Sequence, residues 1–593
     1  MTDAYMIITL RTLNMDDERL IRQLAERIAA KQEKDGSWKL YYDEQAGNVA
    51  ATVDAYYALL SSGFYSKKEQ RMQNAKRFIL SAGGLDKVGT LTKAILALTG
   101  QIPWPWHFKF PVEILLLPPS FPLNFFDFST YARVHLTPIF IAADRNFSIR
   151  AKGMPNLSDL VVQHAQENLE VQRARDDMRS LIRPIKRWIA TLPHLPQHLH
   201  SFALKRAEQY MLDRTEKDGT LYSYASATFL MIYALLALRY PKNHPLIKRA
   251  IDGLKTLTCR TDGHLHLENS TATVWNTALL SHSLQTAGVP ASDPMIQKSG
   301  KYLLSRQHRH YGDWTVHNPN VVPGGWGFSD INTINPDNDD TSAALRAIHQ
   351  LSKTDSTYHD AWERGLNWIL SMQNADGGWA AFEKNTDNVL LPLLPIDGAE
   401  AAATDPSTAD LTGRTLEFLG SQAGLSVKHR IIKRAVDWLF SHTESDGSWY
   451  GRWGVSYIYG TWAALTGLMA VGISPENRVV QQAVKWLAST QNIDGGWGES
   501  CISDVEKRYV PLGASTPSQT AWALDALIAV HEKPTPVIDR GVHYLIESGQ
   551  KTDWTVRYPT GAALPGQFYI HYHGYRYIWP LLTLGNYRRK YMK

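Results

Sequence analysis

Apolar and polar positions follow a helical period through most of the chain, and two kinds of segment alternate. One kind has Leu and small residues on wide arcs, as in 52–60, 461–465 and 520–527. Such segments are apolar on most faces, which predicts buried inner helices. The preceding segments carry Lys, Arg and Glu, which predicts outer helices. Strand patterns are weak, so we predict an all-α fold whose outer and inner helices close into two α/α barrels (toroids).

A short motif recurs between the outer and inner helices: Gln, three residues, Gly, one residue, Trp. A Gln amide can bond an exposed helix end, and Gly allows a turn with positive φ. The motif therefore predicts a structural clasp between neighbouring helices, and its Trp residues are not expected to be catalytic. Intact copies span 32–38, 373–379 and 491–497, and weaker copies end at Trp449 and, after Gln307, at Trp314.

Length and composition favour a globular protein of more than one domain. The 593 residues are too many for one core, and we place the boundary near residue 270, which gives domains 1–270 and 271–593. The net charge of +5 is too diffuse to indicate nucleic-acid binding. The two cysteines form no disulfide framework, and no apolar run has the length of a transmembrane helix.

Two segments interrupt the repeat. The segment 103–138 contains prolines that exclude one continuous helix. The segment 173–196 alternates Arg and Lys with Leu, Ile and Trp188. A basic amphipathic helix of this kind can lie in a membrane interface, and an ordinary surface helix gives the same pattern. Composition alone leaves both interpretations open.

The segment 337–341, Asp-Asn-Asp-Asp-Thr, concentrates three carboxylates at the start of an apolar helix. Carboxylates held together cannot all ionise freely, so one retains its proton more readily than usual. A calcium loop is excluded because position twelve is Ile348 instead of Glu, and no second motif supports a magnesium–diphosphate site. A helix N-cap is the alternative for a single Asp. We predict an acid site that uses no metal and no cofactor.

Such an acid suits the protonation of an alkene, which is a feeble base and needs a strong acid in dry surroundings. A neighbouring cation would stabilise the carboxylate left behind, and Arg414, on the helix that begins at Asp410, is our candidate. Aromatic faces stabilise the carbocations that follow without bonding to them. The chain has 19 Trp, 27 Tyr and 17 Phe, although core packing explains any single ring at least as well.

Together the repeat and the acid motif resemble the squalene–hopene cyclase family of triterpene cyclases over nearly the whole chain. The repeat is similar to the family's QW motif, and 337–341 to its DxDDTA motif. The resemblance implies a large apolar cavity between two barrels, a polyprenyl hydrocarbon substrate, and a monotopic position on the cytoplasmic side of the cell membrane. It implies Asp339 as the proton donor, assisted by Asp337 and Asp340. Asp410 and Arg414 match the two ends of a DVTAH-like string in which Arg replaces His, and we predict that both belong to the catalytic residues.

The resemblance also implies a set of substrate-binding aromatic residues. Each one falls in a string that resembles the family's cavity strings, and Tyr131 stands where Trp is typical. The set comprises Trp326, Phe328, Phe382, Trp453, Tyr459, Tyr131, Phe568 and Tyr572.

A closer resemblance is to the sporulenol synthase (tetraprenyl-β-curcumene cyclase) subfamily, carried by 218–224, 318–329 and 405–410. It implies a thirty-five-carbon, head-cyclised polyprene as substrate and water capture of the last cation, which gives an alcohol. The family's WGGIQP-like string is replaced by 221–226, which argues against hopene-type termination. The resemblance also implies an additional N-terminal segment before the position of Met1, and whether the N-terminus is truncated here is left open by the sequence.

Three other activities stay open. The first is a squalene cyclase that forms hopene or a partially cyclised triterpene. The second is an α/α toroid glycosidase, which needs two carboxylates across a polar cleft. The third is a lipid-binding protein without catalysis. Association into a homodimer is also left open by the sequence.

Overall fold

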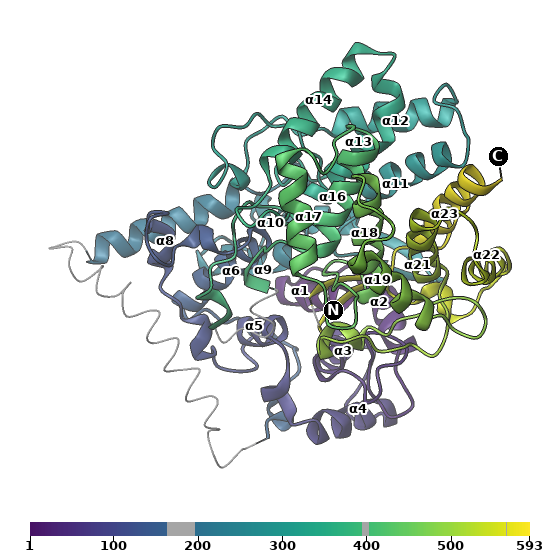
Figure 1. Ribbon diagram of the computed structural model, residues 1–593. Coiled ribbons are helices and arrows are strands. Elements are labelled where there is room, and N and C mark those ends of the chain that lie inside the picture. Colours follow the sequence, from purple (N-terminus) through teal and green to yellow (C-terminus); the bar gives the residue numbers. More distant parts are fainter. Residues whose placement is uncertain (163–195, 394–401, 565, 593) are drawn as a thin grey trace. The chain divides into compact units, whose positions relative to one another are not determined.

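The computed structural model describes residues 1–162, 196–393, 402–564 and 566–592 (Figure 1). Helices dominate these residues, which confirms the predicted all-α class. No helix in this described part of the chain has the length and apolarity that a membrane span requires. Residues 173–195 of the basic segment predicted for a membrane interface lie outside the described residues.

The chain forms two compact units. Unit 1 contains Met1–Leu40, Glu44–Thr271 and Thr386–Thr404, and unit 2 contains Tyr41–Asp43, Ala272–Asn385 and Asp405–Lys593. The division into folding domains near residue 270, and the cavity between two barrels, stay predictions.

Unit 1 follows the predicted alternation of amphipathic and apolar helices. Among its described helices, α1 packs on α3 and α9, α3 packs on α5, and α6 packs on α9. The elements are α1 (Thr2–Leu13), α2 (Glu18–Ala30), α3 (Val49–Ser62), α4 (Gln70–Ser81), α5 (Thr90–Leu98), α6 (Thr130–Asp144), α8 (Pro196–Leu212), α9 (Ala225–Ala237) and α10 (Pro245–Thr256), with a hairpin of β1 (Thr258–Thr261) and β2 (His264–Leu267). The proline-rich segment forms short 3₁₀ turns before α6, as its prolines predict.

Unit 2 is an α/α barrel. Six inner helices, α11, α13, α16, α18, α21 and α23, each pack on the next, and α23 packs back on α11 to close the ring of described helices. The inner helices are α11 (Thr273–Thr286), α13 (Asn338–Ser352), α16 (Ala409–Ser421), α18 (Tyr457–Ala470), α21 (Pro517–Val530) and α23 (Tyr575–Tyr591). The outer helices are α12 (Pro294–Arg306), α14 (Ser356–Ser371), α17 (Arg430–Ser441), α19 (Arg478–Ser489) and α22 (Pro536–Ser548); α20 (Ile502–Glu506), β3 (Gly561–Leu564) and β4 (Phe568–Ile570) lie in the connections.

The Gln–Gly–Trp motifs are clasps, as predicted. The Gln amide nitrogen donates both to the Gly carbonyl of its own turn and to a carbonyl of the next outer helix. The Gly of each regularly spaced copy has a positive φ, for example 105° at Gly377. The Trp indole donates to one of the last four carbonyls of the preceding outer helix, which have no partner within that helix. These pairs are Trp38–Ile28, Trp326–Leu303, Trp379–Ile369, Trp449–Leu439 and Trp497–Leu487.

One predicted clasp was assigned the wrong tryptophan. Gln307 donates to the carbonyls of Gly324 and Ala361 at 2.8 and 2.7 Å, and Trp326 closes the clasp. Trp314 lies in the insertion between Gln307 and Gly324, so its spacing from Gln307 is incidental. The insertion separates the Gln from its Gly, and a fixed spacing could not reveal the true copy.

Close contact between α16 and α18 places the residues of the candidate site. A side chain at Gly413 would meet the carbonyl oxygen of Ala463 at 2.3 Å, and one at Gly467 would meet the carbonyl oxygen of Gly413 at 2.4 Å. Only residues without a Cβ allow the two helices to approach this closely. Arg414, next to Gly413, is thereby held against the side chains of α18.

Candidate active site

The acid motif lies at the N-terminus of α13, inside a clasp. The carboxylate of Asp337 caps the helix by accepting from the backbone N–H of Asp340 at 2.7 Å. The hydroxyl of Thr341 accepts from the backbone N–H of Trp326 at 2.9 Å. The N-cap alternative is therefore right for Asp337, while Asp339 has no capping role.

Burial makes Asp337 and Asp340 unusual acids. Their exposed fractions are 5% and 2%. Burial raises the pKa of Asp340, and the negative charge of Asp337 raises it further. Burial also raises the pKa of Asp337, partly offset by hydrogen bonds from Asp340. The two carboxyls are thus arranged to share one proton near neutral pH, as the crowding of the motif predicts.

Asp339 pairs with Arg414. The guanidinium Nε donates to Oδ1 of Asp339 at 2.5 Å, which confirms the predicted contact. The exposed side-chain fractions are 16% for Asp339 and 3% for Arg414. Burial lowers the pKa of Arg414, but the charge of Asp339, the hydrogen bond to it and the nearby Tyr459 and Glu417 together more than offset this, so the net direction is upward. Arg414 is thus a fixed positive charge beside the most exposed of the three acids.

Three tryptophans surround the guanidinium of Arg414 and form what we call the tryptophan cage. The Arg414 Cζ atom lies 5.2 Å from the ring centroid of Trp275, 5.3 Å from that of Trp462 and 5.6 Å from that of Trp579. Each such contact contributes about 0.5–1 kcal/mol at an exposed site and about 2 kcal/mol when it is desolvated. Sequence reasoning treated Trp462 only as part of a buried helix and passed over Trp275 and Trp579. Their signal was weak, since they lie on three different helices far apart in the chain.

Two further buried aspartates hold the loops that carry predicted substrate aromatics. Asp405 accepts from the backbone N–H groups of Phe382 and Glu383 at 2.7 and 2.9 Å. Asp410 accepts from those of Arg452 and Trp453 at 3.0 and 2.8 Å. Burial raises the pKa of both aspartates. Asp410, which we had grouped with the catalytic acids, is therefore placed as a positioning residue for Trp453, and a direct catalytic role stays a prediction.

Most predicted aromatic residues of unit 2 form ring clusters. Phe382 meets Trp453 edge to face, with centroids 5.7 Å apart. Tyr572 stacks on Tyr575 at 4.2 Å and meets the edge of Phe328 at 6.2 Å. Tyr459 contacts Trp462 and Trp522, with centroids 5.4 and 4.7 Å away. These clusters supply π faces near the acid motif, and their contact with substrate stays a prediction.

The other three predicted aromatics lie in different surroundings. Trp326 is fully buried as a clasp residue, so it has no surface for a substrate and its prediction is corrected. Phe568 is half-buried on β4. Tyr131 belongs to α6 of unit 1, where its hydroxyl donates to the carbonyl of Thr404 at 2.5 Å.

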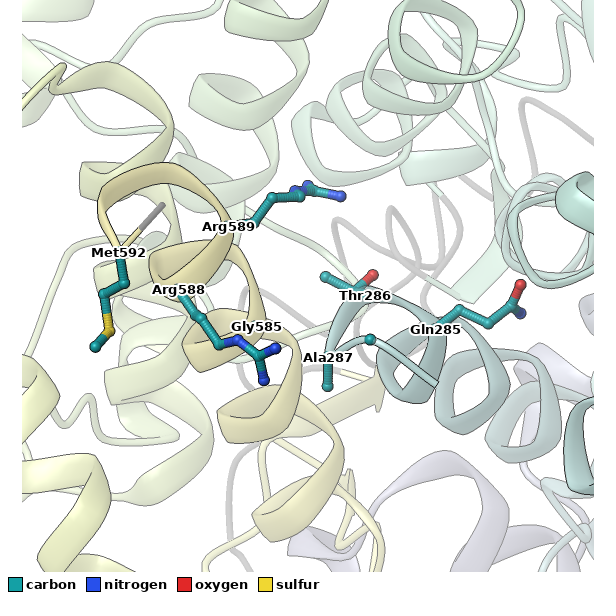
Figure 2. Close-up of a pocket in the computed structure, with 8 residues that line it drawn as sticks. Gln285, Thr286, Ala287, Gly585, Arg588, Arg589 and Met592 are labelled. Carbon is teal, nitrogen blue, oxygen red and sulfur yellow. The ribbon is translucent and has the colours of Figure 1, made fainter. Parts of the chain in front are cut away.

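A pocket of about 440 Å³ opens on unit 2 where the C-terminal ends of α11 and α23 meet (Figure 2). None of the predicted site residues lines it. Arg588 and Arg589 stand in the last turn of α23, where positive charge complements the helix dipole. The pocket is therefore separate from the acid centre. Its lining residues are Gln285, Thr286, Ala287, Gly288, Gly585, Arg588, Arg589 and Met592.

The fold is shared with a solved terpenoid-forming enzyme. The ent-copalyl diphosphate synthase from Streptomyces platensis superposes with a TM-score of 0.53 at 16% sequence identity, covering 98% of this chain and 94% of that one. The fold and the acid centre define a terpene cyclase of the class that starts by protonation.

Family models and relatives agree with this class. The squalene-hopene cyclase N-terminal domain matches residues 1–263, and the C-terminal domain matches residues 271–589. Sporulenol synthase of Bacillus subtilis is 49% identical over 99% of this chain and 92% of its own length. Squalene–hopene cyclase of Alicyclobacillus acidocaldarius is 38% identical over 99% of this chain and 93% of its own length. The chain belongs to the squalene-hopene cyclase family, which removes the glycosidase and the non-catalytic lipid-binding alternatives.

Proposed function

We propose that the chain converts a tetraprenyl-β-curcumene-like polyprene into a polycyclic alcohol of the sporulenol type, with Asp339 as the proton donor. The main observation behind the proposal is the Asp339–Arg414 pair at the N-terminus of α13, where aromatic rings enclose the guanidinium. The similarity to sporulenol synthase supports the choice of substrate class.

The first step is protonation of a terminal alkene. Arg414 occupies Oδ1 of Asp339, so Oδ2 is the oxygen that carries the proton. The fixed guanidinium stabilises the carboxylate that remains after the proton is transferred. The buried Asp337–Asp340 pair retains a proton and so adds less negative charge beside Asp339 than two ionised carboxylates would.

Ring closure then moves the positive charge along the substrate. The rings of Phe382, Trp453, Tyr459, Tyr572 and Phe328 offer π faces that attract a cation and form no bond to it. At the last cation a water molecule adds its oxygen and releases one proton. The net change is the addition of water, which balances the proton spent at the start and requires no cofactor.

Squalene is the alternative substrate, supported by the similarity to squalene–hopene cyclases. Purified enzyme incubated separately with the monocyclic polyprene and with squalene distinguishes the two by chromatography and mass spectrometry of the products. We expect faster turnover of the monocyclic polyprene and an alcohol product. A higher kcat/KM for squalene, or hydrocarbon products alone, would contradict the assignment.

We also infer that the enzyme works at the surface of the cell membrane, on the cytoplasmic side, because its polyprenyl substrate is dissolved in lipid. Co-flotation with anionic lipid vesicles tests this position, and full recovery in the vesicle-free fraction would contradict it. Dimerisation stays a prediction that sedimentation can test.

A further inference from the structure

Asp525 on α21 lies outside every predicted site, yet it is linked to the acid centre by a short series of contacts. We propose that Asp525 is a positioning residue for the Asp339–Arg414 pair and acts through Trp462. The proposal rests on the proposed function only in that Asp339 is taken as the acid. It does not depend on which polyprene is the substrate.

Both oxygens of the Asp525 carboxyl have defined partners. Oδ2 accepts from the indole Nε1 of Trp462 at 3.0 Å, and Oδ1 accepts from the amide Nδ2 of Asn586 at 2.8 Å. The residue is 7% exposed. Because Asp525, Trp462 and Asn586 belong to three inner helices, α21, α18 and α23, the carboxyl fixes the indole against two neighbours at once.

The indole of Trp462 carries this constraint to Arg414. Its ring centroid lies 5.3 Å from the guanidinium carbon and 5.1 Å from the ring of Trp579, another member of the tryptophan cage. The three cage indoles differ in their hydrogen bonding. Trp275 donates to the hydroxyl of Tyr575 at 2.8 Å, Trp579 has no partner for its Nε1 among the described residues, and Trp462 alone of the three donates to a carboxyl.

Arg414 depends on the cage for its orientation. Its Nε is bound by Asp339, whereas its Nη2 is buried and has no hydrogen-bond partner among the described residues. The rings therefore supply much of what holds the guanidinium plane. A carboxyl oxygen that accepts the hydrogen bond of the indole N–H also strengthens the negative face of the ring. Loss of the carboxyl would let Trp462 and Arg414 turn, which would slow proton transfer from Asp339 without altering substrate binding.

A double-mutant cycle on kcat tests the series of contacts. Asp525→Leu and Trp462→Phe should each lower kcat about tenfold and leave KM unchanged. The double variant should also lose about tenfold, because residues in one network are not additive. A hundredfold loss in the double variant, or wild-type kcat in Asp525→Leu, would overturn the proposal. Asp525→Asn keeps an oxygen acceptor for the indole and should retain kcat within about threefold of wild type.

Trp438→Phe is the matched control, because it removes an indole–carboxylate hydrogen bond of the same kind on the outer helix α17, outside the tryptophan cage. Trp438 donates to Asp376 at 2.8 Å, and we expect wild-type kcat from this variant. A tenfold loss there would show that kcat responds to any such bond, which counts against a specific role for Asp525.

Thermal unfolding gives a second readout that needs no turnover. Asp525→Leu should lower Tm in the wild-type background and lower it less in an Arg414→Leu background, where the cage has no guanidinium to hold. Equal Tm losses in both backgrounds would overturn the proposal even if the enzyme turned over neither polyprene. Failure of the proposed function is thereby separated from failure of this inference.

Discussion

The N-termini of α13 and α21 share the same pattern of hydrogen bonds to the backbone, but their side chains differ in chemistry. In α13, Asp337 caps the helix through the N–H of Asp340, and Thr341 accepts from the N–H of the clasp Trp. In α21 the corresponding contacts are made by Thr516, which accepts from the N–H of Gln519, and by Thr520. The backbone N–H of the capping residue in each helix also donates to the backbone carbonyl of its clasp Trp at 2.9 Å.

The two termini differ at the capping residue, Asp337 or Thr516, and at the two residues before the Thr. In α21 these are Ser518 and Gln519, and the Gln amide exchanges two hydrogen bonds of 3.0 Å with the backbone of Glu499. In α13 they are Asp339 and Asp340, which face a guanidinium and a second carboxyl. The comparison shows that the repeat supplies a rigid helix N-terminus. A few side chains then make one of these N-termini an acid site.

The sharpest way to test this comparison is to remove the acid from α13 alone. Asp339→Asn should lower kcat by about 10³-fold, the scale of a lost general acid, with Tm near wild type. Ser518→Ala at the corresponding position should leave kcat unchanged. Product analysis and thermal unfolding measure both. Turnover by Asp339→Asn within tenfold of wild type would show that another group delivers the proton.

Replacing the cation tests whether its geometry matters as well as its charge. Arg414→Lys keeps a positive charge but loses the planar group that contacts Asp339 and the cage. We expect kcat to fall by about 10²-fold, the scale of a lost transition-state contact. Wild-type kcat in this variant would reduce the role of Arg414 to charge alone.

The Thr that both helix N-termini share is tested by making the same substitution in each helix. Thr341→Val and Thr520→Val each leave the backbone N–H of a buried clasp Trp without its acceptor. This should lower the free energy of unfolding by about 1–3 kcal/mol. The two losses, measured in denaturant, should be similar, while kcat should fall only for Thr341→Val. Equal effects on kcat would mean that the acid centre is no more sensitive than the rest of the barrel.

A smaller effect concerns Glu499, the neighbour of Gln519. Its carboxylate accepts from the N–H groups of Ser456, Tyr457 and Ile458, yet burial raises its pKa from 4.5 to about 7. The folded state therefore binds the proton more tightly than the unfolded chain. The stability that this proton contributes is complete below pH 4.5 and is lost as pH rises through 7.

Glu499→Gln removes that titration. The difference in unfolding free energy between wild type and the variant should change by about 1 kcal/mol between pH 5 and pH 6, with wild type losing stability relative to the variant. Denaturant unfolding at the two pH values measures the difference. A constant difference would show that Glu499 does not titrate in this range.

Much of the fold could be predicted because local patterns carry it. The helical period separated inner from outer helices, and the spacing of Gln, Gly and Trp identified the intact clasps. The exception was Gln307, whose partner Trp326 follows an insertion, so the contact is set by the folded ring and not by spacing. Trp326 was assigned to the substrate site because its string resembles the family's cavity strings, whereas its indole is buried in the clasp.

The site was predictable only where its residues are neighbours in sequence or match a shared string. The three aspartates could be predicted because they lie close together in the sequence, and Arg414 because it falls in a string that resembles one of the family's. The tryptophan cage could not be predicted, because Trp275, Trp462 and Trp579 come together only when α11, α18 and α23 close the ring. The anchoring role of Asp410 was hidden for the same reason.

The central claim is that the reaction begins with a proton from Asp339, and cyclisation in D₂O tests it most directly. Because carboxyl protons exchange with solvent, the product formed in D₂O and isolated from H₂O should carry one carbon-bound deuterium at the first ring. The Asp339→Asn variant should form this product about 10³-fold more slowly. A cyclised product without carbon-bound deuterium would contradict initiation by protonation.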